Sequence, residues 1–277
     1  MSAEDYLRFH EQLAPFLFDE QPVAELEAQL GASASGSDNL DFYRVLIGRN
    51  FDKMLRELFA PVHRLAQRLH PGAWPQWTRE YARAYPSVAR DPNWVGEQFS
   101  TWLAQRRERP EGADQSPLLE EMADYVFCRF CASFSADSAA STESTESTES
   151  TESTESSDSR APGPGLPLEP LGDPADDPDG FEQRLFVRLY TFPVVALLAA
   201  LQGDSDAPIP SPQPISVLIY RSTVDGFSLC TYRPSRAELA ALGRRQGLAL
   251  PAPLADLSDA LVDAATAKLV SIGALTA

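Results

Sequence analysis

The sequence predicts an α+β protein: an all-α N-terminal helical domain, a disordered acidic linker and a small α+β C-terminal domain with a β-hairpin and packed helices. Apolar residues before position 136 recur at helical spacing, residues 137–180 are of low complexity, and two later segments are rich in β-branched and aromatic residues. At ~100–200 residues per domain, a chain of 277 residues has room for two modest domains, at 1–136 and 181–277.

The first domain is predicted to consist of helices, beginning with one over Ala3–Leu17. Apolar residues then recur at steps of three, four and five, which predicts one buried stripe along a helix or helix pair: Phe42, Leu46, Phe51, Leu55, Leu58, Val62, Leu65 and Leu69. Pro61 lacks an amide hydrogen, so it either kinks this helix or begins a second one. Further helices are expected over Trp74–Tyr85, Trp94–Arg107 and Pro117–Phe134.

The linker, residues 137–180, contains 12 acidic residues and one basic residue, Arg160. It includes five Ser-Thr-Glu repeats from Ser141 to Glu155 and has no aromatic residue. Such a segment cannot bury enough apolar area to offset the entropy lost on ordering, so it is predicted to be a disordered spacer. The alternative is an acidic peptide that occupies a basic groove.

The second domain begins with a predicted β-hairpin. Its strands are Ile215–Arg221 and Phe227–Arg233, and the connection ends in Asp225-Gly226, a dipeptide that accepts positive φ. Ser235 and Glu238 then have the spacing of a capping box, which predicts a helix that begins there and stops at Gly247. A last helix is expected over Leu257–Ile272, ended by Gly273.

The charge and the hydropathy exclude several classes of protein. With 23 Lys and Arg against 40 Asp and Glu, the net charge of -17 argues against a general nucleic-acid or anionic-membrane binder. Residues 1–20 carry acids where a signal peptide begins with basic residues. The longest apolar run, Phe192–Leu201, contains Pro193 and is far shorter than the ~20 residues that span a bilayer. A cytoplasmic protein is expected.

Cys128 and Cys131 form a C-x-x-C motif, which is typical of a redox pair or of half a zinc site. The remaining candidates, Cys230 and the three histidines, supply no second pair of ligands. The motif also lies in a predicted helix rich in phenylalanine, which favours two buried, small apolar side chains.

Other catalytic motifs are missing from the sequence. It contains neither G-x-S-x-G nor a glycine-rich phosphate loop. The adjacent carboxylates Glu120 and Glu121 are interpreted as part of a solvated helix face. No catalytic residue, metal ligand or cofactor is therefore expected in this chain.

The most distinctive functional feature is a basic segment in an acidic protein. Residues 42–109 contain 12 Lys and Arg against six acids. A helix would place Arg49, Lys53 and Arg56 on one face, with further basic residues before and after them. We interpret the set as a docking surface for an acidic partner: Arg44, Arg49, Lys53, Arg56, Arg64 and Arg68. The alternative is a solvated face whose charges pair within the helix, as Asp52 and Arg56 would.

A wider pattern extends through both domains. The first domain has these features in order: Tyr43-Arg44, Phe59 with Pro61, Trp74 and Trp77 before Tyr81, Tyr85-Pro86, and Phe99 with Trp102-Leu103. The second has VRLYTFPVVALLAALQG, then the hairpin, then a helix ending in Gly273-Ala274-Leu275. In this pattern the chain resembles the bufferin-type accessory proteins, a family earlier described as DNA-binding.

The resemblance implies a non-catalytic partner of a multinuclear non-haem iron oxygenase that modifies cysteines in ribosomally made precursor peptides. Such an adaptor binds the enzyme and helps to present the leader of the precursor peptide, in a heterodimer or heterotrimer. The iron then belongs to the enzyme. A sheet edge can accept an extended peptide, and the candidate peptide-binding residues are Ile215, Val217, Ile219, Arg221, Phe227, Leu229 and Tyr232.

Two alternatives of other classes remain. One is a DNA-binding transcriptional regulator that uses the basic face and a winged-helix-like second domain, although the net charge argues against it. The other is a redox or zinc enzyme that uses Cys128 and Cys131, which ranks last.

Overall fold

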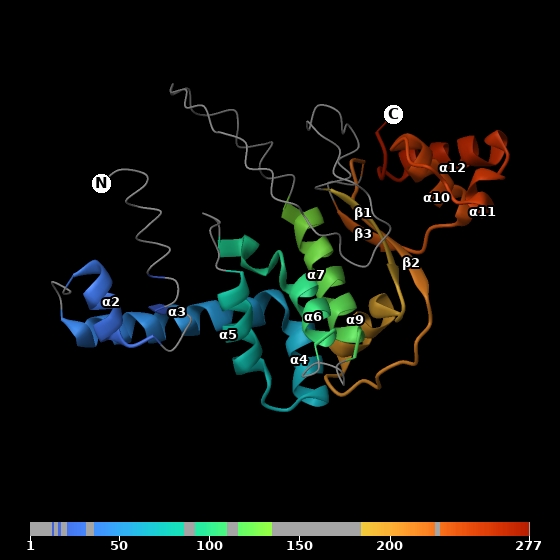
Figure 1. The fold of residues 1–277 in the computed structure, drawn as a ribbon. Helices are drawn as coiled ribbons and strands as arrows, with labels where there is room; N and C mark the ends of the chain where they lie inside the picture. The colour runs from blue at the N-terminus through green and yellow to red at the C-terminus, as the bar shows by residue number, and fades with distance from the viewer. Residues whose placement is uncertain are drawn as a thin grey trace, which may run out of the picture. The chain divides into compact units, whose positions relative to one another are not determined.

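The computed structural model describes residues 13, 16–17, 21–31, 36–85, 92–109, 116–134, 184–224 and 228–276. These residues form helices and a three-stranded antiparallel sheet, so the predicted α+β class is confirmed (Figure 1). The linker predicted at 137–180 lies outside the described residues, as does the N-terminal helix predicted at Ala3–Leu17 apart from three of its residues.

The chain divides into two compact units. The helical unit comprises Met1–Ala123 and Ala200–Asp206, and the sheet unit comprises Asp124–Ala199 and Ala207–Ala277. Two helices, α7 (Leu118–Phe134) and α9 (Val194–Gly203), each contribute residues to both units.

The helical unit contains most of the predicted helices. Its elements before α7 are α2 (Val23–Leu30), α3 (Ser37–Leu58), α4 (Ala60–Leu69), α5 (Trp74–Ala84), the 3-10 helix η1 (Pro92–Gly96) and α6 (Phe99–Arg107). Pro61 begins a second helix rather than kinking the first, because Phe59 leaves the helical conformation with φ -108° and ψ 37°. The helix α2 was not predicted from the sequence.

The helix predicted over Trp94–Arg107 is in fact two elements, η1 and α6. Gly96 ends η1 where the backbone lies directly against the ring of Phe59. A Cβ at Gly96 would come within 2.5 Å of that ring and 2.6 Å of the Leu58 side chain. The close packing of η1 on the end of α3 therefore requires a residue without a side chain at this position.

An aromatic cluster forms the core of the helical unit. The ring of Phe99 lies at the centre, with ring centroids 4.8 Å from Phe59, 5.1 Å from Tyr81 and 5.6 Å from Trp74. The hydroxyl of Tyr81 donates to the carbonyl of Val95 at 2.7 Å, which satisfies the polar atom of a buried ring. These rings join α5 and α6 to the junction of α3 and α4, and the Tyr81 hydrogen bond adds η1 to the same core.

The predicted apolar stripe is only partly buried. Phe51 and Leu55 are in the core, but Phe42 and Leu46 are exposed, at 67% and 41%. The reason is the five-residue step from Leu46 to Phe51: at ~100° per residue it turns the helix by ~500°, which moves the side chain to nearly the opposite face. The prediction that all eight residues share one buried stripe is therefore wrong.

The sheet unit contains the predicted hairpin and a strand that was not predicted. The strands are β1 (Leu185–Tyr190), β2 (Ile215–Arg221) and β3 (Leu229–Tyr232), in the order β1-β2-β3. They are followed by α10 (Arg236–Arg245), α11 (Ala252–Ala255) and α12 (Asp259–Ser271). The sequence of β1, LFVRLY, begins with three consecutive buried apolar residues. It therefore lacks the alternation of apolar and polar residues that indicates a strand with one solvent-exposed face.

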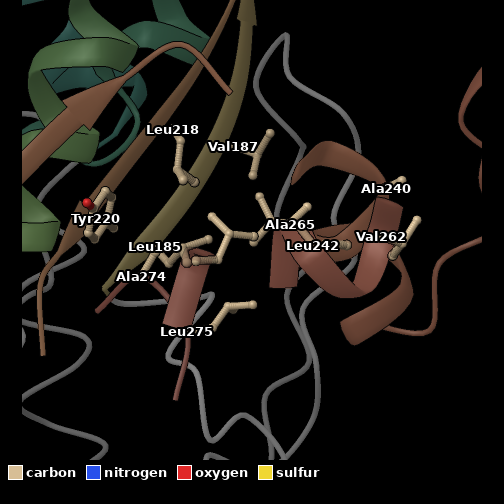
Figure 2. Close-up of a cluster of buried hydrophobic side chains, with 12 residues drawn as sticks. Leu185, Val187, Leu218, Tyr220, Ala240, Leu242, Val262, Ala265, Ala274 and Leu275 are labelled. Atoms are coloured by element: carbon tan, nitrogen blue, oxygen red, sulfur yellow. The ribbon is translucent and has the colours of Figure 1, made fainter. Parts of the chain in front are cut away.

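The two faces of the sheet pack against different helices. On one face, Leu185, Val187, Leu218 and Tyr220 join buried residues of α10 and α12 and of the C-terminal segment (Figure 2). On the other face, two residues of β1 bond to Asp124 of α7, as described below. Both faces of the small sheet are therefore covered, which explains why its central strand is almost wholly apolar.

The predicted start of the first helix in this unit and the predicted end of the last one are confirmed. Ser235 and Glu238 form a capping box at the start of α10. Gly273 follows α12 with φ +70°, and a Cβ there would lie 2.7 Å from the backbone nitrogen of Thr223. That nitrogen donates to the carbonyl of Gly273 at 3.0 Å, so glycine both ends the helix and lets the segment after β2 approach it.

Candidate functional site

The strand β3 has an open edge in the described part of the structure. Arg221 N donates to Arg184 O on the β1 side of β2, and Ser222 N donates to Ser228 O on the β3 side. Antiparallel bonding alternates along a strand, so the N–H and C=O groups of Leu229 and Thr231 point away from β2. These two residues therefore offer four main-chain hydrogen-bonding groups at the open edge.

A cavity of about 330 Å³ adjoins this edge. It is lined by residues of β2, β3 and α12: Tyr220, Cys230, Thr231, Tyr232, Lys268 and Ile272. The Oγ1 of Thr231 is buried and has no hydrogen-bond partner among the described residues. Thr231 pairs with Ile219, so its side chain lies on the opposite face of the sheet from those of Cys230 and Tyr232.

A hydrogen-bonded carboxylate fixes two side chains of the cavity wall. Glu238 Oε1 accepts from Lys268 Nζ at 2.6 Å and from the Tyr232 hydroxyl at 3.1 Å, and its Oε2 accepts from Ser235 N at 2.6 Å. Burial alone would raise the pKa of Glu238, but these donors, Lys268 first, hold it below its ordinary value. Burial and the charge of Glu238 raise the pKa of Tyr232, which keeps its hydroxyl protonated as a donor.

The other edge of the sheet differs from this one. On β1, the guanidinium of Arg188 donates to the carbonyl of Val187 at 3.2 Å, and that carbonyl points away from β2. A side chain of β1 itself thus occupies an acceptor that an added strand would use. Of the two edges, β3 is the better candidate for binding a peptide.

The structure separates the predicted peptide-binding residues into two groups. Val217 and Ile219 lie on β2, the central strand, and are 1% and 0% exposed. Ile215 and Arg221 are on the same strand, and Arg221 donates to the carbonyl of Ser133. Because β2 pairs with both neighbours, it has no edge for an added strand. Leu229 and Tyr232 lie on β3, and Phe227 lies outside the described residues.

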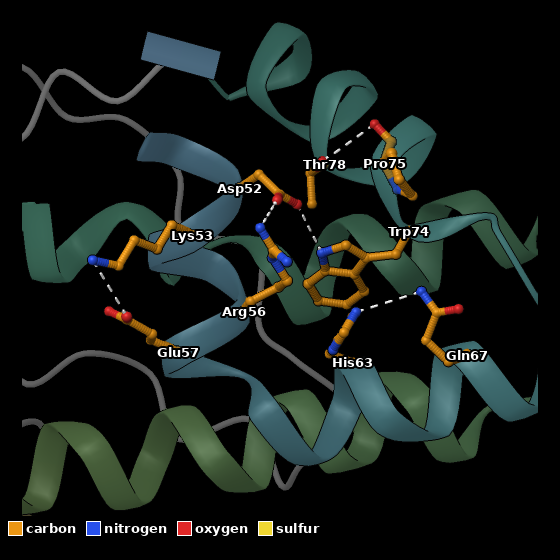
Figure 3. Close-up of polar contacts among 9 residues, drawn as sticks. All are labelled: Asp52, Lys53, Arg56, Glu57, His63, Gln67, Trp74, Pro75 and Thr78. Carbon is orange, nitrogen blue, oxygen red and sulfur yellow. Dashed lines mark hydrogen bonds and ion pairs between the residues drawn. The ribbon is translucent and has the colours of Figure 1, made fainter. Parts of the chain in front are cut away.

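Part of the predicted basic surface pairs with acids on its own helix (Figure 3). Arg56 lies 2.5 Å from Asp52, which also accepts a hydrogen bond from the Trp74 indole at 3.1 Å. Lys53 lies 3.7 Å from Glu57. At these positions the structure agrees with the alternative of a solvated face with intrahelical pairs.

The remaining basic residues have different surroundings. Arg44 pairs with Asp41 at 2.6 Å, and its guanidinium lies 5.0 Å from the ring centroid of Phe16. Arg64, on α4, donates to the carbonyl of Leu201 at 3.0 Å. Arg49 and Arg68 are exposed. Two of the six residues are on α4 and four on α3, so the predicted set is not one continuous helix face.

The C-x-x-C cysteines are buried in α7 as free thiols. Burial, and next the charge of Asp124, raise the pKa of Cys128 well above its ordinary value. A thiol attacks a disulfide or binds zinc as the thiolate, which this environment disfavours. The geometry therefore agrees with the interpretation of buried, small apolar side chains. Among the described residues, no group of three or more His, Cys, Asp or Glu is placed to hold a metal ion.

Sequence reasoning missed a buried polar cluster beside Cys128. Asp124 Oδ2 accepts from Arg188 Nε at 3.1 Å and from the Tyr190 hydroxyl at 2.8 Å. Burial and the Asp124 charge raise the pKa of Tyr190, so its hydroxyl remains a donor. The partners are more than sixty residues apart in the chain, so no local pattern in the sequence could indicate the cluster.

The adjacent carboxylates Glu120 and Glu121 are also placed differently from the prediction. Both are buried, at 5% exposure, and Glu120 accepts two hydrogen bonds from Arg107 at 3.0 and 3.1 Å. The expectation of a solvated helix face was wrong, because a bidentate arginine on α6 compensates the buried charge.

Comparison with known proteins identifies no relative: no protein-family model matches the chain, and no curated protein or solved structure gives a significant match. In the described residues, none of the helices is both long and apolar enough to cross a membrane. The open edge of β3 and its cavity are thus the features that point most directly to a function.

Proposed function

We propose that this chain is a non-catalytic adaptor that binds an extended segment of a precursor peptide along β3 and holds it for a partner enzyme. The open edge of β3, with a cavity beside it, carries this proposal. In strand addition, main-chain hydrogen bonds supply affinity, and pockets for alternate side chains supply specificity. Leu229 and Thr231 provide the main-chain groups.

The cavity favours an apolar side chain in the bound segment. Successive side chains of a strand point to opposite faces of the sheet, so every second residue of an added strand would lie on the face of Cys230 and Tyr232. Aromatic and aliphatic atoms form most of the wall, and the ammonium of Lys268 is already paired with Glu238. A charged side chain would therefore find no compensating partner there.

The short strand also supports a role as one part of a complex. With only two residues directed to the edge, β3 binds a peptide through few main-chain bonds, so affinity and specificity require a further contact. An enzyme that binds both the adaptor and the peptide supplies that contact by raising the effective concentration of the peptide.

The resemblance to the bufferin-type accessory proteins supports the choice of enzyme, a multinuclear non-haem iron oxygenase that modifies cysteines of the peptide. We place this heterodimer or heterotrimer in the cytoplasm, with the iron in the enzyme. The burial and raised pKa of Cys128 support a role without redox chemistry in this chain. The net charge of -17 disfavours DNA and anionic membranes as partners.

Affinity purification of the tagged chain from its native lysate tests the proposal. Mass spectrometry and iron analysis of the eluate should find an iron-loaded enzyme and a small cysteine-containing peptide. Recovery of DNA fragments at physiological salt without an iron protein would overturn the adaptor and favour the transcriptional regulator. Chemical crosslinking of the purified complex then tests where the peptide binds. A peptide that crosslinks to β1 instead of β3 would overturn the proposal that β3 is the peptide-binding edge.

A further inference from the structure

The first half of α3 presents an apolar surface on the outside of the helical unit. Phe42, Val45 and Leu46 are 67%, 47% and 41% exposed. Three large apolar side chains gathered within two turns are uncommon on a monomer surface and are typical of a contact with another protein. We call Phe42, Val45, Leu46 and Arg49 the outer face of α3.

The outer face is directed away from the core of its own unit. At ~100° per residue, its four members fall within a stripe ~100° wide. Phe51 and Leu55, which are buried, lie nearly opposite that stripe around the helix axis. The exposure of Phe42, Val45 and Leu46 is therefore not a gap in the core; these side chains lie where a second helix can pack.

The charges next to the outer face are arranged symmetrically about its middle. Asp41 precedes Val45 by four residues and Arg49 follows it by four, so an acid and a base lie ~6 Å along the axis on either side. Asp41 is 52% exposed in its pair with Arg44, and Arg49 is exposed with no ion pair in the described part of the chain.

We propose that two copies of this chain associate through antiparallel pairing of their α3 helices, centred on Val45. Residues whose numbers sum to about 90 then lie opposite each other. Val45 meets Val45 of the second copy, and Asp41 of each copy lies near Arg49 of the other. A two-fold axis relates the two copies, so the same surface of each chain supplies one acid and one base, and both charge pairs form. This use of the same surface by both copies defines an isologous interface.

This inference does not depend on the proposed function, because α3 and β3 belong to different units. A second copy is favoured over an unrelated helix because the acid, the apolar centre and the base already complement themselves when the direction of the helix is reversed. An unrelated partner would have to carry the same arrangement independently.

Sedimentation of the full chain over a range of concentrations tests the association. We expect a reversible dimer, and Val45→Asp should convert it to a monomer. Leu261→Asp is the matched control, since Leu261 is similarly exposed at 54% but lies on α12. The proposal would be overturned if the wild-type chain is a monomer at every concentration, or if Leu261→Asp dissociates the dimer as much as Val45→Asp does. The outer face would then be a binding surface for a different protein.

A charge exchange tests the antiparallel geometry. Arg49→Glu places like charges opposite each other and should raise the dimer dissociation constant about tenfold. The double variant Asp41→Arg with Arg49→Glu restores opposite charges and should recover most of the affinity. If the double variant is as weak as the single one, the proposed pairing is wrong.

Disulfide trapping tests the centre of symmetry. In a Cys230→Ser background, Val45→Cys should form a disulfide-linked dimer on mild oxidation. Lys53→Cys is the control: positions 53 of two antiparallel helices lie sixteen residues apart along the axis, about 24 Å, and cannot be bridged. Efficient crosslinking of Lys53→Cys without that of Val45→Cys would overturn the antiparallel arrangement.

Discussion

Ion pairs on α3 and polar clusters around the sheet follow different rules. On α3, partners are three or four residues apart and remain partly exposed, as in Arg44 with Asp41, or largely exposed, as in Lys53 with Glu57. Around the sheet, Arg188 reaches Asp124 across 64 residues, and both side chains are mostly buried. Exposed local pairs contribute little to stability. Breaking a buried pair is costly, because it leaves a charged group with neither a partner nor solvent around it.

The largest expected effect is at the buried cluster. Asp124→Ala would leave the Arg188 guanidinium and the Tyr190 hydroxyl without their shared acceptor, and should lower the free energy of unfolding by about 3–5 kcal/mol. Urea denaturation measures the loss. The double variant Asp124→Ala with Arg188→Met removes the charge as well and should recover part of it. A loss below about 1 kcal/mol for Asp124→Ala would remove the distinction between the two regions.

The next effect concerns the cavity. Cys230→Phe would fill the space beside β3 without removing a main-chain bond, so peptide recovery by the tagged chain should fall at least about tenfold, while the enzyme is still retained. Leu189→Phe, on β1, enlarges an exposed side chain at the other edge and should leave peptide recovery unchanged. Peptide binding that is insensitive to Cys230→Phe would exclude the cavity from the site.

A pH-dependent effect of about 1 kcal/mol is expected at Glu238. Its pKa is lower in the folded chain than its ordinary value of 4.5, so its contribution to stability is fully present above that pH and lost as the pH falls through the folded pKa. Glu238→Gln should therefore lower the melting temperature at pH 7 and have a smaller effect at pH 3. Thermal unfolding followed by circular dichroism checks this, with the exposed Glu57→Gln as control.

The smallest effect is expected on α3. Lys53→Ala removes an exposed pair with Glu57 whose side chains are 69% and 68% accessible, and should change stability by about 0.5 kcal/mol or less. Urea denaturation at low and high salt measures it. A loss comparable to that of Asp124→Ala would show that α3 pairs are not merely local and solvated.

Much of the secondary structure could be predicted because its signals are local. Pro61 begins α4, Ser235 and Glu238 cap α10, and Gly273 follows α12, each through the conformation or hydrogen bonding of a few neighbouring residues. The strand β1 was missed because both of its faces are covered, which removes the alternation of apolar and polar residues.

The sequence by itself determined the α+β class, the boundaries at the start of α4 and α10 and the end of α12, and the pairing of the two hairpin strands, since these follow from short-range backbone chemistry. Only the tertiary structure decided which apolar and charged residues are buried. It turned Phe42 outward, placed Val217 in the central strand and buried Glu120 against Arg107. Burial depends on partners brought together by the fold, and a local pattern does not specify those partners.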